Sequence, residues 1–276
     1  MLDIQPDRSY IKNLLIAGFD VYLIDWGYPT KGDRYLSMDD YVNGYINNCV
    51  DFIRKKNRLD KINILSICHV GSLSVIYSSL FPNKVKNLVT HVTPIDFSTN
   101  DGLLFKWSRD MDFDKLVDAN HGLVPGDFLN QGFDMLKPMM KVQKQQTLTN
   151  SLDDKDKLMN FLRMEKWISE SPDQAGECFR QFMKELYQQN KLAKGELEVG
   201  GKKVNLKNLT SPLLNIYATE DHLVPPAATI PLNELVGSKD KELYSFKGGH
   251  IGVFVGGKSQ KELAPAVTEW LKKRDK

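Results

Sequence analysis

Three residues far apart in the chain have the types and the order of a nucleophile, an acid and a histidine. Cys68 lies between a short apolar segment and a helical one, Asp221 follows another apolar segment, and His250 lies in a glycine-rich loop. A thiol whose proton is taken by an imidazole, itself held by a carboxylate, can attack a carbonyl carbon and carry an acyl group as a thioester. We therefore predict a catalytic triad of Cys68, Asp221 and His250.

The surroundings of Cys68 resemble the sharp strand-to-helix turn that presents a nucleophile. The helix that follows would point the positive end of its dipole at the thiol, which favours the thiolate. The backbone N–H of His69, directly after the nucleophile, is the expected oxyanion donor. Ser66 and Val70 replace the two glycines of the usual Gly-x-nucleophile-x-Gly pattern. Taken alone, this segment fits a buried structural cysteine equally well.

The two later segments support the triad. Asp221 lies in a loop directly after an apolar segment, and the order nucleophile, acid, histidine is that of the α/β-hydrolase fold. A turn cap is the alternative role for Asp221. The glycines around His250 free its loop to present the ring. We expect His222 to point elsewhere and the side chains of the remaining histidines to be structural: His69, His91 and His121.

Alternating apolar and amphipathic segments must position these residues. We predict strands at 19–26, 62–67, 85–92, 213–218 and 243–246, and helices at 7–18 (capped by Asp7), 38–56, 72–80 and 259–273. Such alternation implies right-handed crossovers and a mostly parallel sheet. Residues 101–205 are largely helical and polar, without a clear strand. We expect an α/β-hydrolase core from residues 1–100 and 206–276, with a helical cap at 101–205.

Composition narrows the function classes. The chain has 276 residues with a net charge of +2 and interleaved acids and bases, unlike a nucleic-acid-binding surface. No apolar run is long enough to span a membrane, and the N-terminus has no secretory signal pattern. Three scattered cysteines suit neither a disulfide framework nor a zinc site. We expect a cytoplasmic protein with free thiols and no metal.

A cysteine nucleophile also narrows the chemistry. Thiolate attack on a thioester is nearly balanced energetically, so the acyl group can be loaded and passed on, whereas an oxygen nucleophile suits hydrolysis better. Cys68 therefore favours acyl transfer from a thioester such as an acyl-coenzyme A, although cysteine hydrolases exist.

Several long, rare strings give the chain a specific resemblance to a known family. Over nearly its whole length it resembles the catalytic subunit of the class III, two-component polyhydroxyalkanoate synthases. The strings are Leu2–Pro6, Asp20–Gly27, Val92–Phe97, Asn160–Ile168, Ser171–Glu177, Asp221–Pro226 and Gly248–Gly252. The family box reads Gly-Ile-Cys-Gln-Gly-Gly, where this chain has Ser66, His69 and Val70 at three positions.

The resemblance implies an acyltransferase that joins 3-hydroxyacyl groups into a polyester and releases coenzyme A. Cys68 would carry the growing chain, His250 would activate the thiol, and Asp221 would help deprotonate the attacking 3-hydroxyl. Coenzyme A would arrive with the substrate, expected to be short-chain such as 3-hydroxybutyryl-CoA, and no other cofactor is expected. A small companion subunit is implied, a homodimer is compatible, and the polyester granule surface would be the working location.

Two other functions remain open from the sequence. One is an esterase or thioesterase on the same fold. The other is a catalytically impaired or non-catalytic chain that binds a partner subunit or a granule. The altered residues around Cys68 motivate the second, as does the family's additional sequence before the position of Leu2, which contributes early strands and a second oxyanion donor. We accordingly expect a sheet without its first strands.

Overall fold

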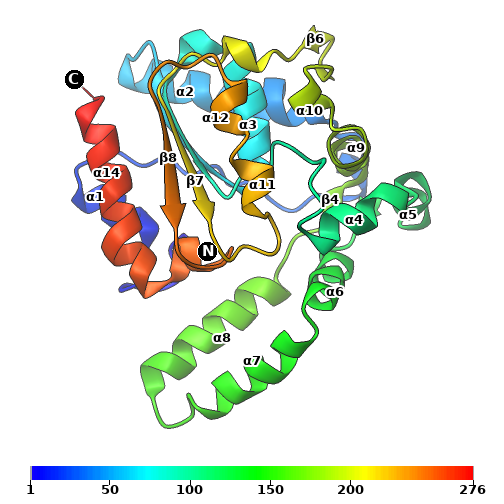
Figure 1. The fold of residues 1–276 in the computed structure, drawn as a ribbon, viewed down its shortest axis with the longest axis vertical. Coiled ribbons are helices and arrows are strands. Elements are labelled where there is room, and N and C mark those ends of the chain that lie inside the picture. Colours follow the sequence, from blue (N-terminus) through cyan, green and yellow to red (C-terminus); the bar gives the residue numbers. More distant parts are fainter. Residues whose placement is uncertain (1, 276) are drawn as a thin grey trace.

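A four-stranded parallel sheet forms the centre of the computed structural model, which describes residues 2–275 (Figure 1). Its strand order is β1-β2-β7-β8, and every neighbouring pair is parallel. The bounds are β1 Ile62–Ile67, β2 Val85–His91, β7 Leu213–Ala218 and β8 Lys241–Phe246. These four strands confirm the predictions at 62–67, 85–92, 213–218 and 243–246, with β8 beginning two residues earlier. Their carboxyl ends all lie at one edge of the sheet.

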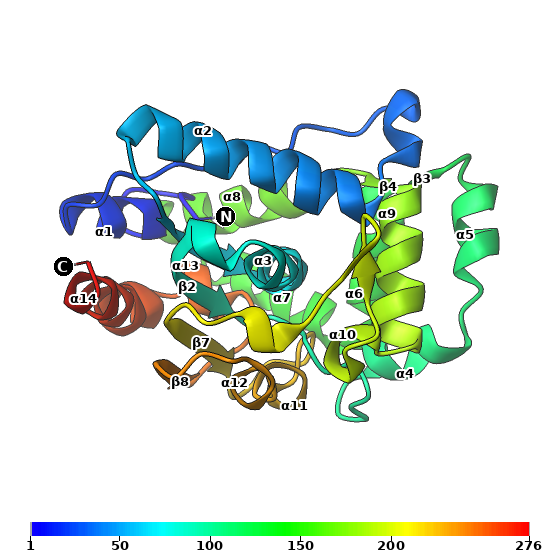
Figure 2. The ribbon, with the colours of Figure 1, turned by 90° about the horizontal axis from the view of Figure 1, so that it is seen from above.

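Helices cover both faces of the sheet (Figure 2). Because side chains alternate along a strand, Leu88 and Leu213 face one core while their neighbours Val89 and Leu214 face the other. The first core includes the central helix α3 (Cys68–Leu80), η2 (Asp40–Ile46), α2 (Asn47–Asn57) and α12 (Leu232–Leu235). The second includes α13 (Gly252–Val255), η6 (Ser259–Leu263) and α14 (Ala264–Lys273).

The central helix α3 begins four residues earlier than predicted. Residues Gly71–Ser79 are all buried, so this helix is enclosed between the sheet and the helices around it. Its first residue is Cys68, directly after the last residue of β1. The earlier start places the candidate nucleophile on the helix itself, in its first turn.

The N-terminal part departs from the prediction in two ways. Helix α1 runs from Tyr10 to Ile16 and is capped by the hydroxyl of Ser9, which accepts from the N–H of Lys12, not by Asp7. The prediction of a strand at residues 19–26 was wrong. The structure pairs this segment with no other strand. Their composition favours extended backbone, but a strand forms only where a neighbour satisfies its hydrogen bonds. Leu23 is therefore 70% exposed.

Short elements lie between these helices and strands. They are η1 (Lys31–Tyr35), η3 (Pro82–Lys84), η5 (Leu206–Asn208) and α11 (Pro226–Thr229). The turn η3 connects α3 to β2, and α11 follows the loop that holds Asp221.

The segment between β2 and β7 is mostly helical, as predicted. Its helices are α4 (Leu103–Asp110), α5 (Phe113–Ala119), α6 (Gly126–Leu136), α7 (Met139–Thr149), α8 (Lys155–Ser169), α9 (Gly176–Gln181), the π-helix η4 (Phe182–Gln188) and α10 (Lys191–Lys194). Two short antiparallel pairs also occur, β3 (Leu123–Val124) with β4 (Gln174–Ala175), and β5 (Glu198–Val199) with β6 (Lys202–Lys203). The expectation that this segment contains no strand was therefore wrong for these short strands.

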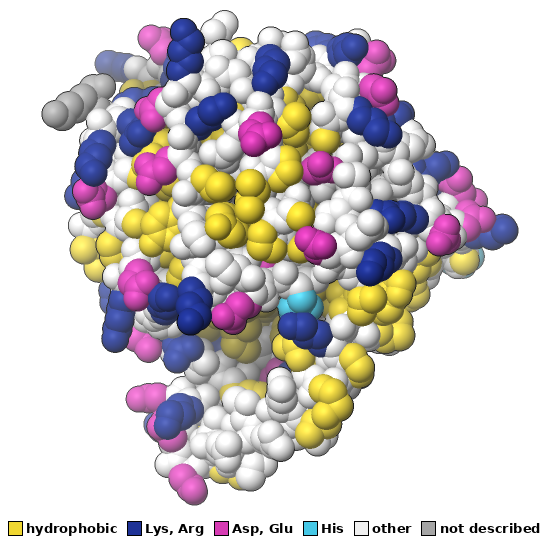
Figure 3. Space-filling view, in the orientation of Figure 1, with side chains coloured by type: hydrophobic (Ala, Val, Ile, Leu, Met, Phe, Trp, Pro, Cys, Tyr) yellow, Lys and Arg dark blue, Asp and Glu magenta, His cyan; other side chains and the backbone are white. Residues whose placement is uncertain are grey.

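Helices α7 and α8 form a two-helix arm that extends away from the sheet (Figure 1). None of the side chains that the structure describes in α7 and α8 is buried; the side chain of Lys141 is not described. The surface is hollowed between this arm and the rest of the molecule (Figure 3). Within residues 2–275, none of the helices is long and apolar enough to cross a membrane.

Candidate active site

Cys68 lies on a strained strand-to-helix turn at the carboxyl end of β1. Ile67 is extended, whereas Cys68 has φ of +53°, a left-handed conformation that is uncommon for a residue with a side chain. Such strain persists where the surrounding packing holds it, often at functional sites. The turn thus has the geometry of a nucleophile elbow, although its sequence lacks both usual glycines.

Gly71 provides the close contact that this turn requires. A Cβ atom at Gly71 would overlap the side chain of Thr93, which follows β2. The helix therefore lies closest to Thr93 at Gly71, one residue after Val70, and Val70 itself is only partly buried. Ser66, at the other altered position, is buried, and its hydroxyl has no hydrogen-bond partner within residues 2–275.

Asp221 and His250 meet at the same edge of the sheet. Asp221 lies three residues after β7 ends, and His250 lies four residues after β8 ends. Nδ1 of His250 is 2.6 Å from Oδ2 of Asp221, so the ring donates its N–H to the carboxylate. The other oxygen, Oδ1, accepts from the backbone N–H groups of Leu223 and Val224, both at 2.9 Å. Asp221 therefore caps its own turn and also holds the imidazole.

The thiol of Cys68 interacts with the other side of this pair. Burial alone would raise the pKa of Cys68, but the charge of His250 and hydrogen bonds from His250 and His69 outweigh it and lower the pKa to about 6. At neutral pH the sulfur is therefore a thiolate, the form that acts as a nucleophile.

The pKa of His250 shifts in the opposite direction to that of Cys68. Burial alone would lower its pKa, but the charge of Cys68 and the hydrogen bonds with Asp221 and Cys68 raise the pKa to about 10. The ring is 7% exposed and lies edge-on to Phe254, with centroids 6.4 Å apart. A thiolate and an imidazolium thus face each other, with a buried carboxylate behind the ring.

The other histidines differ in their distance from this site. The side chain of His69, predicted to be structural, packs edge-on against Phe182 with ring centroids 6.1 Å apart, and it also helps to lower the pKa of the Cys68 thiol. Its backbone N–H lies in the first turn of α3, where helical N–H groups lack a partner within the helix.

His91 is buried and bonded to the hydroxyl of Tyr10 at 3.0 Å, and His121 lies on the surface. His222 is half-buried beside the site, where burial and the charge of Lys137 lower its pKa.

Tyr187, from the π-helix η4, belongs to the core against which Cys68 packs, and the sequence analysis did not name it. Burial and the charges of Cys68 and Asp221 raise the pKa of Tyr187 well above its usual value. It belongs to the first core, against which Cys68 and Leu223 pack. No local pattern marks this tyrosine, because it is brought to the site by the packing of the inserted helices.

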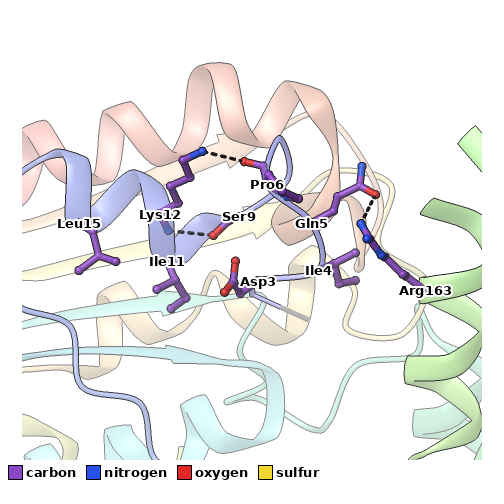
Figure 4. Close-up of a pocket in the computed structure, with 9 residues that line it drawn as sticks. All are labelled: Asp3, Ile4, Gln5, Pro6, Ser9, Ile11, Lys12, Leu15 and Arg163. Atoms are coloured by element: carbon purple, nitrogen blue, oxygen red, sulfur yellow. Dashed lines mark hydrogen bonds between the residues drawn. The ribbon is translucent and has the colours of Figure 1, made fainter. Parts of the chain in front are cut away.

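Among residues 2–275, no group of three His, Cys, Asp or Glu side chains is placed to hold a metal ion. A surface pocket lies between the N-terminal segment and α8, where Arg163 bonds Gln5 at 3.4 Å (Figure 4). This pocket contains none of the three triad residues, so it is separate from the candidate site.

Comparisons with known proteins identify the family. The family model described as "alpha/beta hydrolase fold" matches residues 3–257. Among curated proteins, the poly(3-hydroxyalkanoate) polymerase subunit PhaC of Allochromatium vinosum is 54% identical over 275 residues, covering 99% of this chain and 77% of that protein. The subunit of the same name from Synechocystis sp. is 50% identical, covering 99% and 74%.

Solved structures show the same fold at low sequence identity. The Paleococcus ferrophilus monoacylglycerol lipase has a TM-score of 0.57 and 15% identity, covering 96% of this chain and 89% of the other. A Thermogutta terrifontis esterase has a TM-score of 0.52 and 12% identity, covering 93% and 77%. These two matches establish the fold alone. The curated relatives and the family model together establish more: the chain belongs to the PhaC subunits of the poly(3-hydroxyalkanoate) polymerases, a family with the α/β-hydrolase fold.

Proposed function

We propose that this chain is an acyltransferase that polymerises 3-hydroxyacyl groups from coenzyme A thioesters into a polyester, with Cys68, His250 and Asp221 as its catalytic triad. The observation that carries the proposal is the 2.6 Å bond between His250 and Asp221 at the sheet edge where the strained turn presents Cys68, whose thiol pKa the imidazole lowers. The relatives named as poly(3-hydroxyalkanoate) polymerase subunits supply the substrate class.

The first half of the reaction loads the enzyme. The sulfur of Cys68 attacks the carbonyl carbon of the thioester, and the oxygen gains negative charge opposite the backbone N–H of His69. The bond to the coenzyme A sulfur then breaks, and the departing sulfur takes the proton from His250. Cys68 is left as an acyl thioester, and His250 is left neutral beside Asp221.

The second half forms the ester. The 3-hydroxyl oxygen of an acyl unit attacks the thioester carbon on Cys68, while its proton passes to His250, whose positive charge Asp221 stabilises. The bond to the Cys68 sulfur breaks, and the thiolate returns opposite the imidazolium. Each cycle releases one coenzyme A for each ester bond formed, so no external oxidant or reductant is needed.

Further features of the proposal follow from the family. The preferred substrate is short-chain, such as 3-hydroxybutyryl-CoA, and the only cofactor is the coenzyme A that the substrate carries. A small companion subunit works with the chain at the surface of cytoplasmic polyester granules. The inserted helices, residues 101–205, form a cap that controls access to the site, which is consistent with the place of Tyr187, from that region, in the core against which Cys68 packs.

The test measures coenzyme A release from 3-hydroxybutyryl-CoA, with and without a companion subunit. Polymer formed with stoichiometric coenzyme A, and lost in Cys68→Ala, supports the proposal. Free 3-hydroxybutyrate would instead identify a thioesterase. Failure of radiolabelled acyl-CoA to label Cys68, even with the companion subunit present, would identify a non-catalytic chain.

A further inference from the structure

Phe254 is a buried residue that packs directly against the imidazole of His250. The two rings meet edge-on with centroids 6.4 Å apart, and Phe254 is 1% exposed. It lies in α13, the short helix that follows the His250 loop, and its N–H donates to the carbonyl of Ile251 at 3.0 Å. The proposed mechanism gives Phe254 no chemical role. Whatever fixes the ring of Phe254 nevertheless helps to fix the imidazole.

The ring of Phe254 also contacts His91, the last residue of β2, with centroids 5.8 Å apart. His91 is completely buried, and its Nε2 is hydrogen-bonded to the hydroxyl of Tyr10 at 3.0 Å. The rings of Tyr10 and His91 meet edge-on at 5.4 Å. Contacts between buried rings therefore run without a break from α1 to His250.

The bond between Tyr10 and His91 joins two uncharged groups. Burial lowers the pKa of His91 to about 3 and raises the pKa of Tyr10 well above its usual value. A buried hydrogen bond between neutral groups fixes their orientation, because loss of one partner leaves the other unpaired. The ring of His91 is therefore held in one arrangement against Phe254.

The backbone after His91 is also fixed. Val92 is completely buried and has φ of +43°, a left-handed conformation that is rare for a β-branched residue. Its N–H donates to the carbonyl of Ile216 in β7 at 2.7 Å. Strained backbone of this kind persists only where the surrounding structure holds it. His91 therefore projects its ring from a rigid strand end.

A second set of contacts joins α1 to the same phenylalanine. Nε2 of Gln260, in η6, donates to the backbone carbonyl of Phe254. Oε1 of Gln260 accepts from the side-chain amide of Asn13, on α1, at 2.6 Å. Figures 1 and 2 show α1 beside α14, the helix that continues from η6. Helix α1 thus holds Phe254 twice, through its ring and through its carbonyl.

We propose that α1 positions the imidazole of His250 through two links, one by way of His91 and one by way of Gln260. Tyr10, His91 and Gln260 are then positioning residues, which act on the reaction only through Phe254. The inference rests on the proposed triad. It adds that the N-terminal helix, on a different element from each triad residue, sets how well the imidazole serves the thiol.

The experiment measures the pH profile of Cys68 alkylation by iodoacetamide, and kcat and KM for coenzyme A release from 3-hydroxybutyryl-CoA. Tyr10→Phe removes the bond to His91 but keeps the ring, and Gln260→Leu breaks the second link. A loosened imidazole stabilises the thiolate less, so the alkylation midpoint should rise by about one pH unit in each variant. We expect kcat to fall about tenfold with KM unchanged within about twofold, because misplacing a catalytic group slows the chemistry without removing a substrate contact.

Tyr77→Phe is the matched control. Tyr77 is also completely buried, and its hydroxyl bonds Asn47 at 3.3 Å, but it belongs to the first core whereas Phe254 belongs to the second. Its alkylation midpoint and kcat should match those of the wild type. Thermal unfolding checks that each variant is folded at the assay temperature. If Tyr10→Phe does not fold, Gln260→Leu decides, because that side chain is only partly buried.

Unshifted midpoints in the folded variants would overturn the inference and show that α1 only packs against the core. An equal shift in Tyr77→Phe would also overturn it, because the effect would then come from general loosening. If the wild type released no coenzyme A while the midpoints moved as expected, the proposed function would fail and this inference would stand. A wild-type midpoint at about 8.5, that of an ordinary thiol, would overturn both.

Discussion

Nδ1 of His250 lies 2.6 Å from Oδ2 of Asp221, and the carboxylate of Asp221 is completely buried. Its second oxygen accepts two backbone N–H groups, from Leu223 and Val224. The carboxylate therefore cannot rotate away from the ring without losing those bonds. This arrangement fixes the imidazole with its other nitrogen free for Cys68.

Asp221→Asn should lower kcat for coenzyme A release by about 10³- to 10⁴-fold. The amide oxygen can still accept from the turn, but it brings no negative charge to stabilise the imidazolium of His250. Thermal unfolding of the variant should remain close to that of the wild type. An activity loss below tenfold would show that Asp221 is only a turn cap.

Alkylation of Cys68 should follow its lowered pKa. Only the thiolate reacts, so the iodoacetamide rate should fall as the pH drops through about 6 and should be level between pH 7 and 8. Cys178 provides an internal contrast, because burial and the charges of Asp40 and Glu177 raise its pKa to about 12. Peptide mass spectrometry at pH 7 should therefore find Cys68 labelled and Cys178 unlabelled. Equal labelling of the two would contradict the thiolate assignment.

His250→Gln should move that alkylation midpoint upward. The substitution removes the largest effect that lowers the pKa of Cys68, while burial continues to favour the neutral thiol. The alkylation rate at pH 7 should fall by about tenfold or more, since an ordinary thiol is only a few per cent ionised there. His121→Gln, on the surface, serves as the control and should leave the profile unchanged. An unshifted midpoint in His250→Gln would show that the imidazole of His250 does not lower the pKa of the Cys68 thiol.

Gly71→Ala should destabilise the turn that presents Cys68. The added methyl group overlaps the side chain of Thr93, and overpacking of this kind costs about 1–3 kcal/mol. Gly132, within α6, is a matched control because a Cβ there meets nothing within 4 Å. Gly132→Ala should be neutral or stabilising by about 0.5–1 kcal/mol. Denaturant unfolding measures both, and Gly71→Ala as stable as the wild type would refute the close contact.

Local sequence predicted much of the fold. The segments that became β1 and β2 are short and rich in β-branched residues, and the segment that became β7 is short and apolar, so local propensity and tertiary structure agree. Residues 19–26 have a similar composition but form no strand in the structure. Pairing depends on a neighbouring strand, and a segment's own residues cannot show whether one is present.

The sequence by itself determined the order of the chemistry-bearing residues, the strand ends that precede Cys68, Asp221 and His250, and the family. Only the tertiary structure decided that His69 helps to lower the pKa of the thiol, that Gly71 rather than Val70 lies against Thr93, and that Tyr187 of the inserted helices joins the core against which Cys68 packs. The physical reason is that hydrophobic periodicity reports which face of an element is buried. The partner that each buried side chain meets depends on how distant elements pack together.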